Sequence, residues 1–336
     1  MTATPAVSVI TPTRNRARLL RETLDSVAAQ TLANWEHIVV DDGSDDETST
    51  MMAARIAADP RVSYVIRQSP TAGANVCRNI GIKAARAPLL VLLDSDDLLE
   101  PDCLERRVRL MQRNPELDFA TFQGGVFVER PGDRGRVMDD QLIGDDLCRF
   151  LFFEAPWQTT GPIWRRDSLL ELGLFDEALL SWQDIELHVR AITRGRHYLR
   201  FPEVDHHIRW QFEPTKVSVE QRRSPRHLEG AMDVIERLEA HVRAGPGMNW
   251  VRQRALCSLY FFVAELWVER GDLKPGLDAW RRTRVRRLGP ASLHLAGALL
   301  LALKRLGLPT TTLVRKWKGW ARLRTLPELV PTRRRA

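Results

Sequence analysis

The chain has 336 residues, of which 44% are hydrophobic and 28% are charged. These proportions are typical of a folded globular protein and exclude an intrinsically disordered chain, and the length allows one large domain and a smaller one. The net charge of +7 is unevenly distributed: residues 281–336 contain fifteen Lys or Arg and one acid, Glu328, so this segment carries +14 and the first 280 residues carry −7. This asymmetry predicts that the basic tail has an anionic partner of its own.

Two features of the sequence indicate a cytoplasmic setting. The first apolar stretch, AVSVI at residues 6–10, has only five residues and runs directly into TPTRNR, which suits a first strand better than a signal peptide. The four cysteines include no C-x-x-C pair, a pattern typical of reduced thiols.

Strand-like and helix-like segments alternate from Val7 to about Phe201. The expected strands of the first hundred residues lie at 7–10, 37–40, 62–66 and 89–93. Helices are expected to open near Asn15, at about residue 75 and at Pro101, since proline suits an early helical position. This alternation predicts a mainly parallel sheet with helices on both faces. Neither G-x-G-x-x-G after the first strand nor G-x-x-x-x-G-K-[ST] is present, which argues against dinucleotide and P-loop sites.

After about residue 215 the pattern changes to helices only. Three helices are expected at 227–242, 252–272 and 274–289. The second and third are predicted to form a hairpin that turns at Gly271. An apolar run at 293–303 follows, which is well short of the roughly 20 residues that a membrane-spanning helix needs.

The tail from residue 290 to 336 combines apolar, aromatic and basic residues. Trp317 and Trp320 lie among five Lys or Arg residues, a composition that favours a helix lying in the interface of an anionic membrane. A core helix with a solvated basic face is the alternative. Nucleic acid is not expected as a partner, because no recognised nucleic-acid-binding module accompanies the charge.

The stretch VLLDSDD, residues 91–97, places three aspartates directly after a buried strand. Such carboxylates repel one another unless positive charge lies nearby, and the carboxyl ends of parallel strands are where open α/β sheets bind ligands. An EF-hand loop starting at Asp94 fails, because Leu98 and Leu99 stand at its fifth and sixth positions. A helix N-cap accounts for at most one carboxylate. The remaining interpretation is Mg²⁺ or Mn²⁺ held by one or two carboxylates and completed by substrate phosphates.

Two further acidic segments are candidate functional sites. Asp41 and Asp42 follow the second strand and should reach the same edge of the sheet, where a carboxylate can accept hydrogen bonds from a base or a ribose. The alternative is a turn with Gly43 at positive φ and an acid that caps the next helix. Asp184 opens a helix after Trp182 and is either a cap or a general base beside a reactive hydroxyl.

With these residues in place, the chain resembles the family 2 inverting glycosyltransferases of the GT-A fold over Val7 to about Phe201. The resemblance rests on four motifs in the family's order: VSVITPTRNRARLLRETLDSVAAQT, WEHIVVDDGSDD, GANVCRNIGIKAARAPLLVLLDSDD and GPIWRRDSLLELGLFDEALLSWQDIELHVRA. It implies a Rossmann-like, mainly parallel sheet flanked by helices. Residues 1–215 would form the GT-A catalytic domain, and residues 216–336 a helical extension with a basic amphipathic tail.

The resemblance also implies roles for individual residues. The donor-binding residues would be Pro12, Thr13, Arg14, Asp42, Arg78 and Asp94, with Asn79 either near the donor or structural. Asp96, together with Asp94, would hold the metal, and Asp184 would be the catalytic base. Two positions depart from the family's pattern: Gln183 stands where an acid is usual before the base, and Arg209 is not followed shortly by a histidine.

The implied activity is metal-dependent, inverting transfer of a sugar from a nucleoside diphosphate sugar, by family habit a UDP-sugar. The acceptor would be a hydroxyl of a glycan or lipid-linked molecule, as in bacterial cell-surface polysaccharide synthesis. The enzyme would be cytoplasmic, at the inner face of the membrane, with Mg²⁺ or Mn²⁺ as cofactor. Two alternatives stay open: a non-catalytic sugar-nucleotide-binding scaffold and a nucleotidyltransferase.

Overall fold

The structure is a computed structural model that describes residues 4–139, 144–210 and 224–308. These residues fall into two compact units. The first unit contains residues 4–139, 157–178 and 195–210, and the second contains 144–156, 179–194 and 224–308. The second unit thus takes in two segments that precede residue 215. The predicted functional division at that residue stays a prediction.

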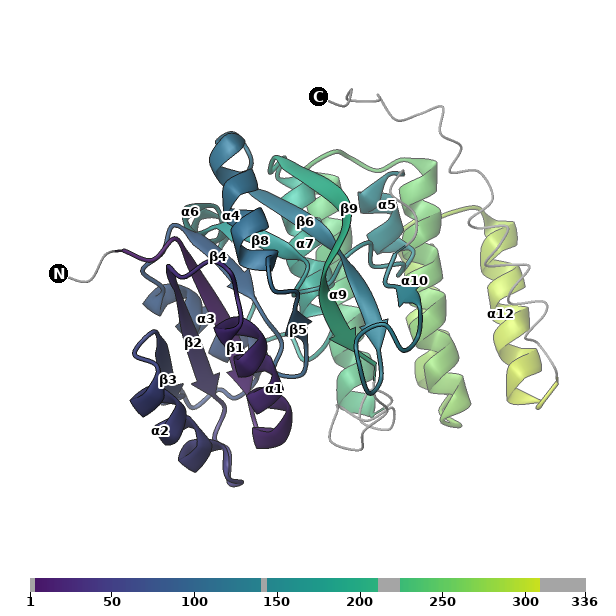
Figure 1. Cartoon of the computed structure of the whole chain (residues 1–336). Helices are drawn as coiled ribbons and strands as arrows, with labels where there is room; N and C mark the ends of the chain where they lie inside the picture. Colours follow the sequence, from purple (N-terminus) through teal and green to yellow (C-terminus); the bar gives the residue numbers. More distant parts are fainter. Residues whose placement is uncertain (1–3, 140–143, 211–223, 309–336) are drawn as a thin grey trace. The chain divides into compact units, whose positions relative to one another are not determined.

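A nine-stranded sheet forms the centre of the first unit (Figure 1), in the order β3-β2-β1-β4-β8-β6-β9-β5 with β7 paired to β6. Its strands are β1 (Val7–Thr13), β2 (Trp35–Asp41), β3 (Val62–Ile66), β4 (Leu89–Leu92), β5 (Leu98–Leu99), β6 (Phe119–Phe127), β7 (Arg136–Val137), β8 (Pro162–Arg165) and β9 (Tyr198–Arg209). The strands from β3 to β4 are all parallel, as the sequence predicts. Beyond β4 the sheet is mixed, because β8 runs antiparallel to both β4 and β6.

Helices cover both faces of the parallel strands. The helices of the first unit are α1 (Ala17–Ala28), α2 (Thr48–Ala58), α3 (Ala74–Ala84), α4 (Cys103–Arg113) and α6 (Arg166–Leu172). On one face, Val9 of β1 belongs to a buried cluster with Leu20 of α1 and Leu104 of α4. On the other face, α3 lies so close to β1 that a Cβ added to Gly81 would stand 2.4 Å from Ile10 Cγ2. Successive side chains of a strand point to opposite faces. Because helices cover both faces of β1, all seven of its residues are buried.

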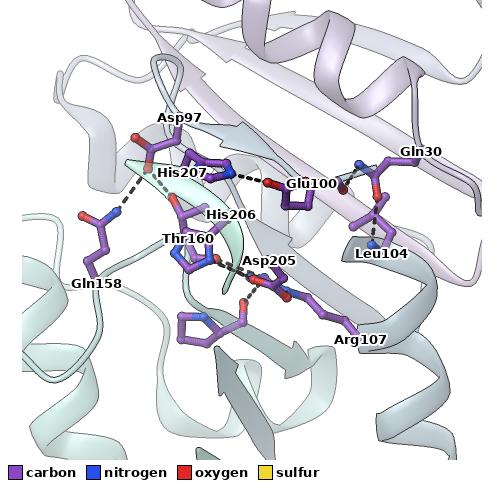
Figure 2. Close-up of polar contacts among 11 residues, drawn as sticks. Gln30, Asp97, Glu100, Leu104, Arg107, Gln158, Thr160, Asp205, His206 and His207 are labelled. Carbon is purple, nitrogen blue, oxygen red and sulfur yellow. Dashed lines mark hydrogen bonds and ion pairs between the residues drawn. The ribbon is translucent and has the colours of Figure 1, made fainter. Parts of the chain in front are cut away.

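A fully buried ion pair joins α4 to β9 (Figure 2). Arg107 Nε and Nη2 each lie 2.7 Å from an oxygen of the Asp205 carboxylate, and neither side chain is exposed. His206 Nδ1 lies 2.9 Å from Asp205 Oδ1, and Arg107 Nη1 donates to the Thr160 carbonyl at 3.0 Å. Burial raises the pKa of Asp205, but the charge of Arg107 and the hydrogen bonds from Arg107 and His206 together lower that pKa to about 2. The pair therefore stays ionised and ties β9, the strand next to edge strand β5, to α4.

The second unit of the described chain is helical. Its helices are α5 (Asp146–Leu151), α7 (Gln183–Thr193), α9 (Pro225–Ala244), α10 (Trp250–Glu269), α11 (Leu273–Val285) and α12 (Ala291–Arg305). α10 and α11 pack together across a turn at Gly271, whose φ is +98°, so the predicted hairpin is confirmed. Within the described ranges, no helix is both long enough and apolar enough to cross a bilayer. The predicted interfacial segment around Trp317 and Trp320 lies outside the described residues.

We expect Arg107→Met to lower the free energy of unfolding by about 3–5 kcal/mol, because the substitution leaves Asp205 as an uncompensated buried charge. Arg109→Met on the same helix is the matched control, since Arg109 pairs with Glu105 at the surface and its loss should cost about 1 kcal/mol or less. Urea unfolding followed by circular dichroism measures both values. Equal stabilities of the two variants would contradict a stabilising role for the buried pair.

Candidate functional site

The ends of β1, β2 and β4 meet at one edge of the sheet. Asp42 N donates to the Thr13 carbonyl at 2.9 Å, which joins the ends of β1 and β2. Leu93 N donates to the Ile10 carbonyl at 2.9 Å, which leads β4 into the acidic loop beside them. Pro12 and Thr13 are buried at this edge and Arg14 is exposed. The structure therefore brings together the donor-side residues that the sequence predicts on three separate strands.

Asp42 lies in a ring of donors at this edge. Its Oδ1 accepts hydrogen bonds from Arg67 Nε and from the backbone N–H of Gly73, the latter at 3.0 Å, and its Oδ2 lies 3.9 Å from Arg14 Nη1. Burial and the neighbouring Asp42 charge raise the pKa of the Cys77 thiol to about 12, so this cysteine is a poor nucleophile. Asp42 thus lies close to two arginines and a backbone N–H, an arrangement that suits a polar ligand.

Asp41, by contrast, stabilises the turn that follows β2. Its Oδ1 accepts from Ser44 N at 3.0 Å and from Ser44 Oγ at 2.7 Å, and the hydroxyl of Tyr64 donates to Oδ2. Gly43 has a φ of +84°, as the turn interpretation requires. Residue type alone left the two aspartates equivalent and the family resemblance singled out Asp42; the hydrogen bonds now show that Asp41 stabilises the turn.

Each of the first two acids of the Asp94–Asp97 loop lies beside an arginine. Arg78 Nη2 donates to Asp94 Oδ1 at 2.7 Å, and Arg16 Nη1 lies 3.5 Å from Asp96 Oδ2. The Asp94 side chain is 32% exposed and that of Asp96 is 6% exposed. From the sequence, bound ligands were expected to supply the positive charge that offsets the repulsion among these aspartates. The arginine side chains of the protein already supply part of that charge.

The third acid of the loop, Asp97, has a separate set of partners that the sequence analysis missed (Figure 2). Its carboxylate accepts hydrogen bonds from Thr160 Oγ1 at 2.7 Å, Gln158 Nε2 at 3.2 Å and Arg209 N at 3.2 Å. Burial is the largest cause that raises the pKa of Asp97, followed by the charges of Asp96 and Asp94. These partners come from distant segments, so no local sequence pattern indicates them.

Asn79 has a structural role on α3. Its side-chain amide donates to the Phe175 carbonyl and to Glu177 Oε1, both at 2.9 Å, and its Oδ1 accepts from Phe175 N at 3.0 Å. These bonds hold the segment after α6 against α3. The neighbouring Arg78 instead turns its guanidinium to Asp94, so the two adjacent residues serve different purposes.

Asp184 belongs to the second unit, in the first turn of α7. Trp182 precedes this helix with a φ of +57° and packs against the ring of Phe153, with 4.7 Å between centroids. Glu186 on the same helix is committed to ion pairs with Arg190 and His241. Asp184 is only half-buried, and its assignment as the base stays a prediction.

The donor set at the loop fits a hard divalent cation. In the part of the chain that the structure describes, no group of three or more His, Cys, Asp or Glu side chains could hold a metal. Asp94 and Asp96 provide carboxylate oxygens, and Mg²⁺ or Mn²⁺ held by one or two carboxylates takes its other ligands from water and phosphate. Arg209 donates to the Asp96 carbonyl and pairs with Glu22, so it strengthens the loop without being a ligand.

Comparison with known protein families identifies related sequences. The family described as Glycosyl transferase family 2 matches residues 8–158, and Glycosyl transferase family group 2 matches residues 89–321. An uncharacterized protein of Sinorhizobium fredii is 29% identical over 69% of this chain and 25% of its own length. An uncharacterized glycosyltransferase of Rickettsia prowazekii is 31% identical over 54% of this chain and 57% of its own length. A Bacillus subtilis protein named for teichuronic acid biosynthesis is 34% identical over 43% of this chain and 58% of its own length. The match thus spans between a quarter and just over half of these relatives.

Solved structures share the fold. S. aureus TarS 1–349 in complex with UDP-GlcNAc superposes with a TM-score of 0.67 at 17% identity, covering 90% of this chain and 92% of that chain. The mannosyltransferase PcManGT of Pyrobaculum calidifontis, solved with GDP-Man and Mn²⁺, gives a TM-score of 0.55 at 20% identity, covering 96% of this chain and 84% of that one. These similarities confirm the predicted fold class.

Proposed function

The chain belongs to the family 2 glycosyltransferases, as its motifs predicted, and on that premise we propose that it transfers a sugar from a nucleoside diphosphate sugar to an acceptor hydroxyl with inversion. The observation that carries the proposal is the meeting of Asp42, Asp94 and Asp96 at one edge of the sheet, with arginines beside each. Such an edge suits a ligand that has both hydroxyl groups and negative charge. The similar structures, solved with UDP-GlcNAc and with GDP-Man and Mn²⁺, support a nucleotide sugar as that ligand.

The residues of the edge divide into two groups by chemistry. Asp42, beside buried Pro12 and Thr13, would accept hydrogen bonds from the base or ribose. Asp94 would contact the ribose or sugar, and together with Asp96 it would hold Mg²⁺ or Mn²⁺. When bound, such a cation supplies positive charge to the leaving diphosphate.

The transfer itself is a single displacement. Asp184 takes the proton from the acceptor hydroxyl as its oxygen forms a bond to the anomeric carbon. The bond from that carbon to the diphosphate breaks on the opposite face, and its electron pair leaves with the nucleoside diphosphate. We propose a hexose as the transferred sugar and a glycan or lipid-linked molecule as the acceptor, and the relative named for teichuronic acid biosynthesis supports a cell-surface polymer.

We expect Asp184→Asn to retain donor binding and to lose transfer by about 10²–10⁴-fold, because an amide cannot accept the proton. Radiolabelled sugar transfer and calorimetric donor binding measure the two effects. Asp233→Asn, an exposed position on α9, is the matched control and should behave as wild type. Wild-type turnover in Asp184→Asn would contradict the assignment.

The two rival functions are separated by the product that wild-type protein releases. A glycosyltransferase releases the nucleoside diphosphate, for example UDP. A nucleotidyltransferase releases pyrophosphate, and a scaffold binds the nucleotide sugar without releasing either. Family membership favours the first outcome.

We further propose that the C-terminal region, residues 290–336, docks on an anionic membrane surface at the cytoplasmic face. Leu295 and Leu299 are 77% and 60% exposed and lie one turn apart on α12, and Leu306, which directly follows the helix, is 74% exposed. Residues 309–336 then add eight Lys or Arg against the single acid Glu328. An exposed apolar stripe next to a strongly basic segment suits an anionic lipid interface.

We expect replacement of Leu295, Leu299 and Leu306 by serine to reduce co-sedimentation with phosphatidylglycerol-containing vesicles. Leu199→Ser, at an exposed site in the first unit, is the control and should sediment as wild type does. Unchanged sedimentation of the triple variant would show that this face of α12 does not bind lipid. Sedimentation of wild type with neutral vesicles to the same extent would exclude the electrostatic part of the proposal.

A further inference from the structure

The four-residue turn from Asp94 to Asp97 is fixed from several sides. Asp97 N donates to the Asp94 carbonyl at 3.1 Å, which closes the turn on itself. The Asp97 carbonyl accepts from Thr23 Oγ1 on α1 at 2.9 Å, and the Asp96 carbonyl accepts from Arg209 Nε at 3.1 Å. The next two residues form β5, which pairs with β9. The backbone of the turn therefore has little freedom to move.

The Asp97 side chain adds a connection that the other two acids lack. Its carboxylate is bound by the Thr160 hydroxyl, the Gln158 amide and the Arg209 backbone N–H, and the residue is 2% exposed. Thr160 Oγ1 also lies 3.5 Å from Asp94 N, so one hydroxyl touches both ends of the turn. Figure 2 shows the Asp97 carboxylate directed at Gln158 and Thr160.

This direction separates Asp97 from the edge where the donor-side acids lie. Asp94 and Asp96 lie beside Arg78 and Arg16, whereas Asp97 accepts hydrogen bonds from uncharged donors of the 158–160 segment and of β9. Burying a carboxylate costs free energy unless it is hydrogen-bonded, and two neighbouring acids add to that cost. Packing alone therefore does not explain why Asp97 stands in this turn.

We propose that Asp97 is a positioning residue which, through Thr160, Gln158 and Arg209, sets where the carboxylates of Asp94 and Asp96 stand toward the nucleotide sugar. The inference rests on the proposed donor site. The three donors fix the carboxylate of Asp97, the carboxylate fixes its end of the turn, and the turn carries Asp94 and Asp96. Partners behind a binding group commonly change affinity or activity by about 10–100-fold when they are removed.

Thr160→Val tests the proposal, since valine keeps the shape of the buried threonine and removes its hydroxyl. We expect about 10–100-fold weaker binding of UDP, with and without Mn²⁺, in calorimetric titrations of the full chain. Thr160→Ser keeps a hydroxyl and should bind UDP as wild type does. Should Thr160→Val fail to fold, Gln158→Met carries the same test, because it removes the longer bond to Asp97 and should weaken UDP binding to a smaller extent.

The first unit offers a matched control of the same bond type. Ser168 Oγ donates to Asp118 Oδ1 at 2.6 Å, and Asp118 also accepts from His197 N at 2.7 Å, as Asp97 accepts from Thr160 and Arg209. Ser168→Ala removes this hydroxyl away from the Asp94–Asp97 turn. It should lower the melting temperature to about the same extent as Thr160→Val and leave the UDP affinity unchanged.

The outcomes distinguish the inference from the proposed function. Weaker UDP binding in Thr160→Val, with wild-type binding in Thr160→Ser and Ser168→Ala, supports the positioning role. Wild-type affinity in a folded Thr160→Val, or in Gln158→Met, overturns that role even if stability falls. If wild-type protein binds none of UDP, GDP, CDP and ADP, the donor site itself fails, and the positioning inference fails with it.

Discussion

The constraint on which the site depends is the repulsion among three carboxylates within four residues. The chain meets it by giving each acid its own partner: Arg78 beside Asp94, Arg16 beside Asp96, and a set of hydrogen-bond donors around buried Asp97. The acids are therefore held in place before a ligand arrives. The proposed cation and nucleotide would add to the positive charge that the arginines already supply, which favours a preorganised site.

The sheet supplies the scaffold for this balance. Parallel pairing brings the ends of β1, β2 and β4 to one edge, and β9 pairs with β5, the two residues that follow the acidic loop. The Arg107–Asp205 pair ties β9 to α4. Arg107 also donates a hydrogen bond to the carbonyl of Thr160, the residue whose hydroxyl binds Asp97, so the buried pair helps to hold Thr160 in place. The buried ion pair and the residues proposed to position the acidic loop thus form one connected group.

Local patterns in the sequence predicted what is local in the structure. The strands, the first helices and the D-x-D acids follow from apolar runs that end in polar residues, and the parallel half of the sheet follows from their alternation. The Asp97 partners could not be predicted, because Gln158 and Arg209 lie far along the chain, Gln158 carries no motif, and Arg209 contacts the Asp97 carboxylate through its backbone N–H. Asp41 and Asp42 looked alike by residue type and only the family resemblance singled out Asp42, whereas the role of Asp41 became visible through tertiary contacts such as that of Tyr64.

The most direct measurement is a thermal-unfolding panel of wild-type protein with UDP, GDP, CDP and ADP, each with and without Mn²⁺. A nucleotide at about 100 times its dissociation constant stabilises the folded state by about 2.7 kcal/mol, which is readily detected. We expect one nucleotide to stabilise the protein more strongly with Mn²⁺ and Asp96→Asn to lose this added stabilisation. A full Mn²⁺-dependent shift in Asp96→Asn, or no shift with any nucleotide, would contradict the central claim that these acids form the donor site.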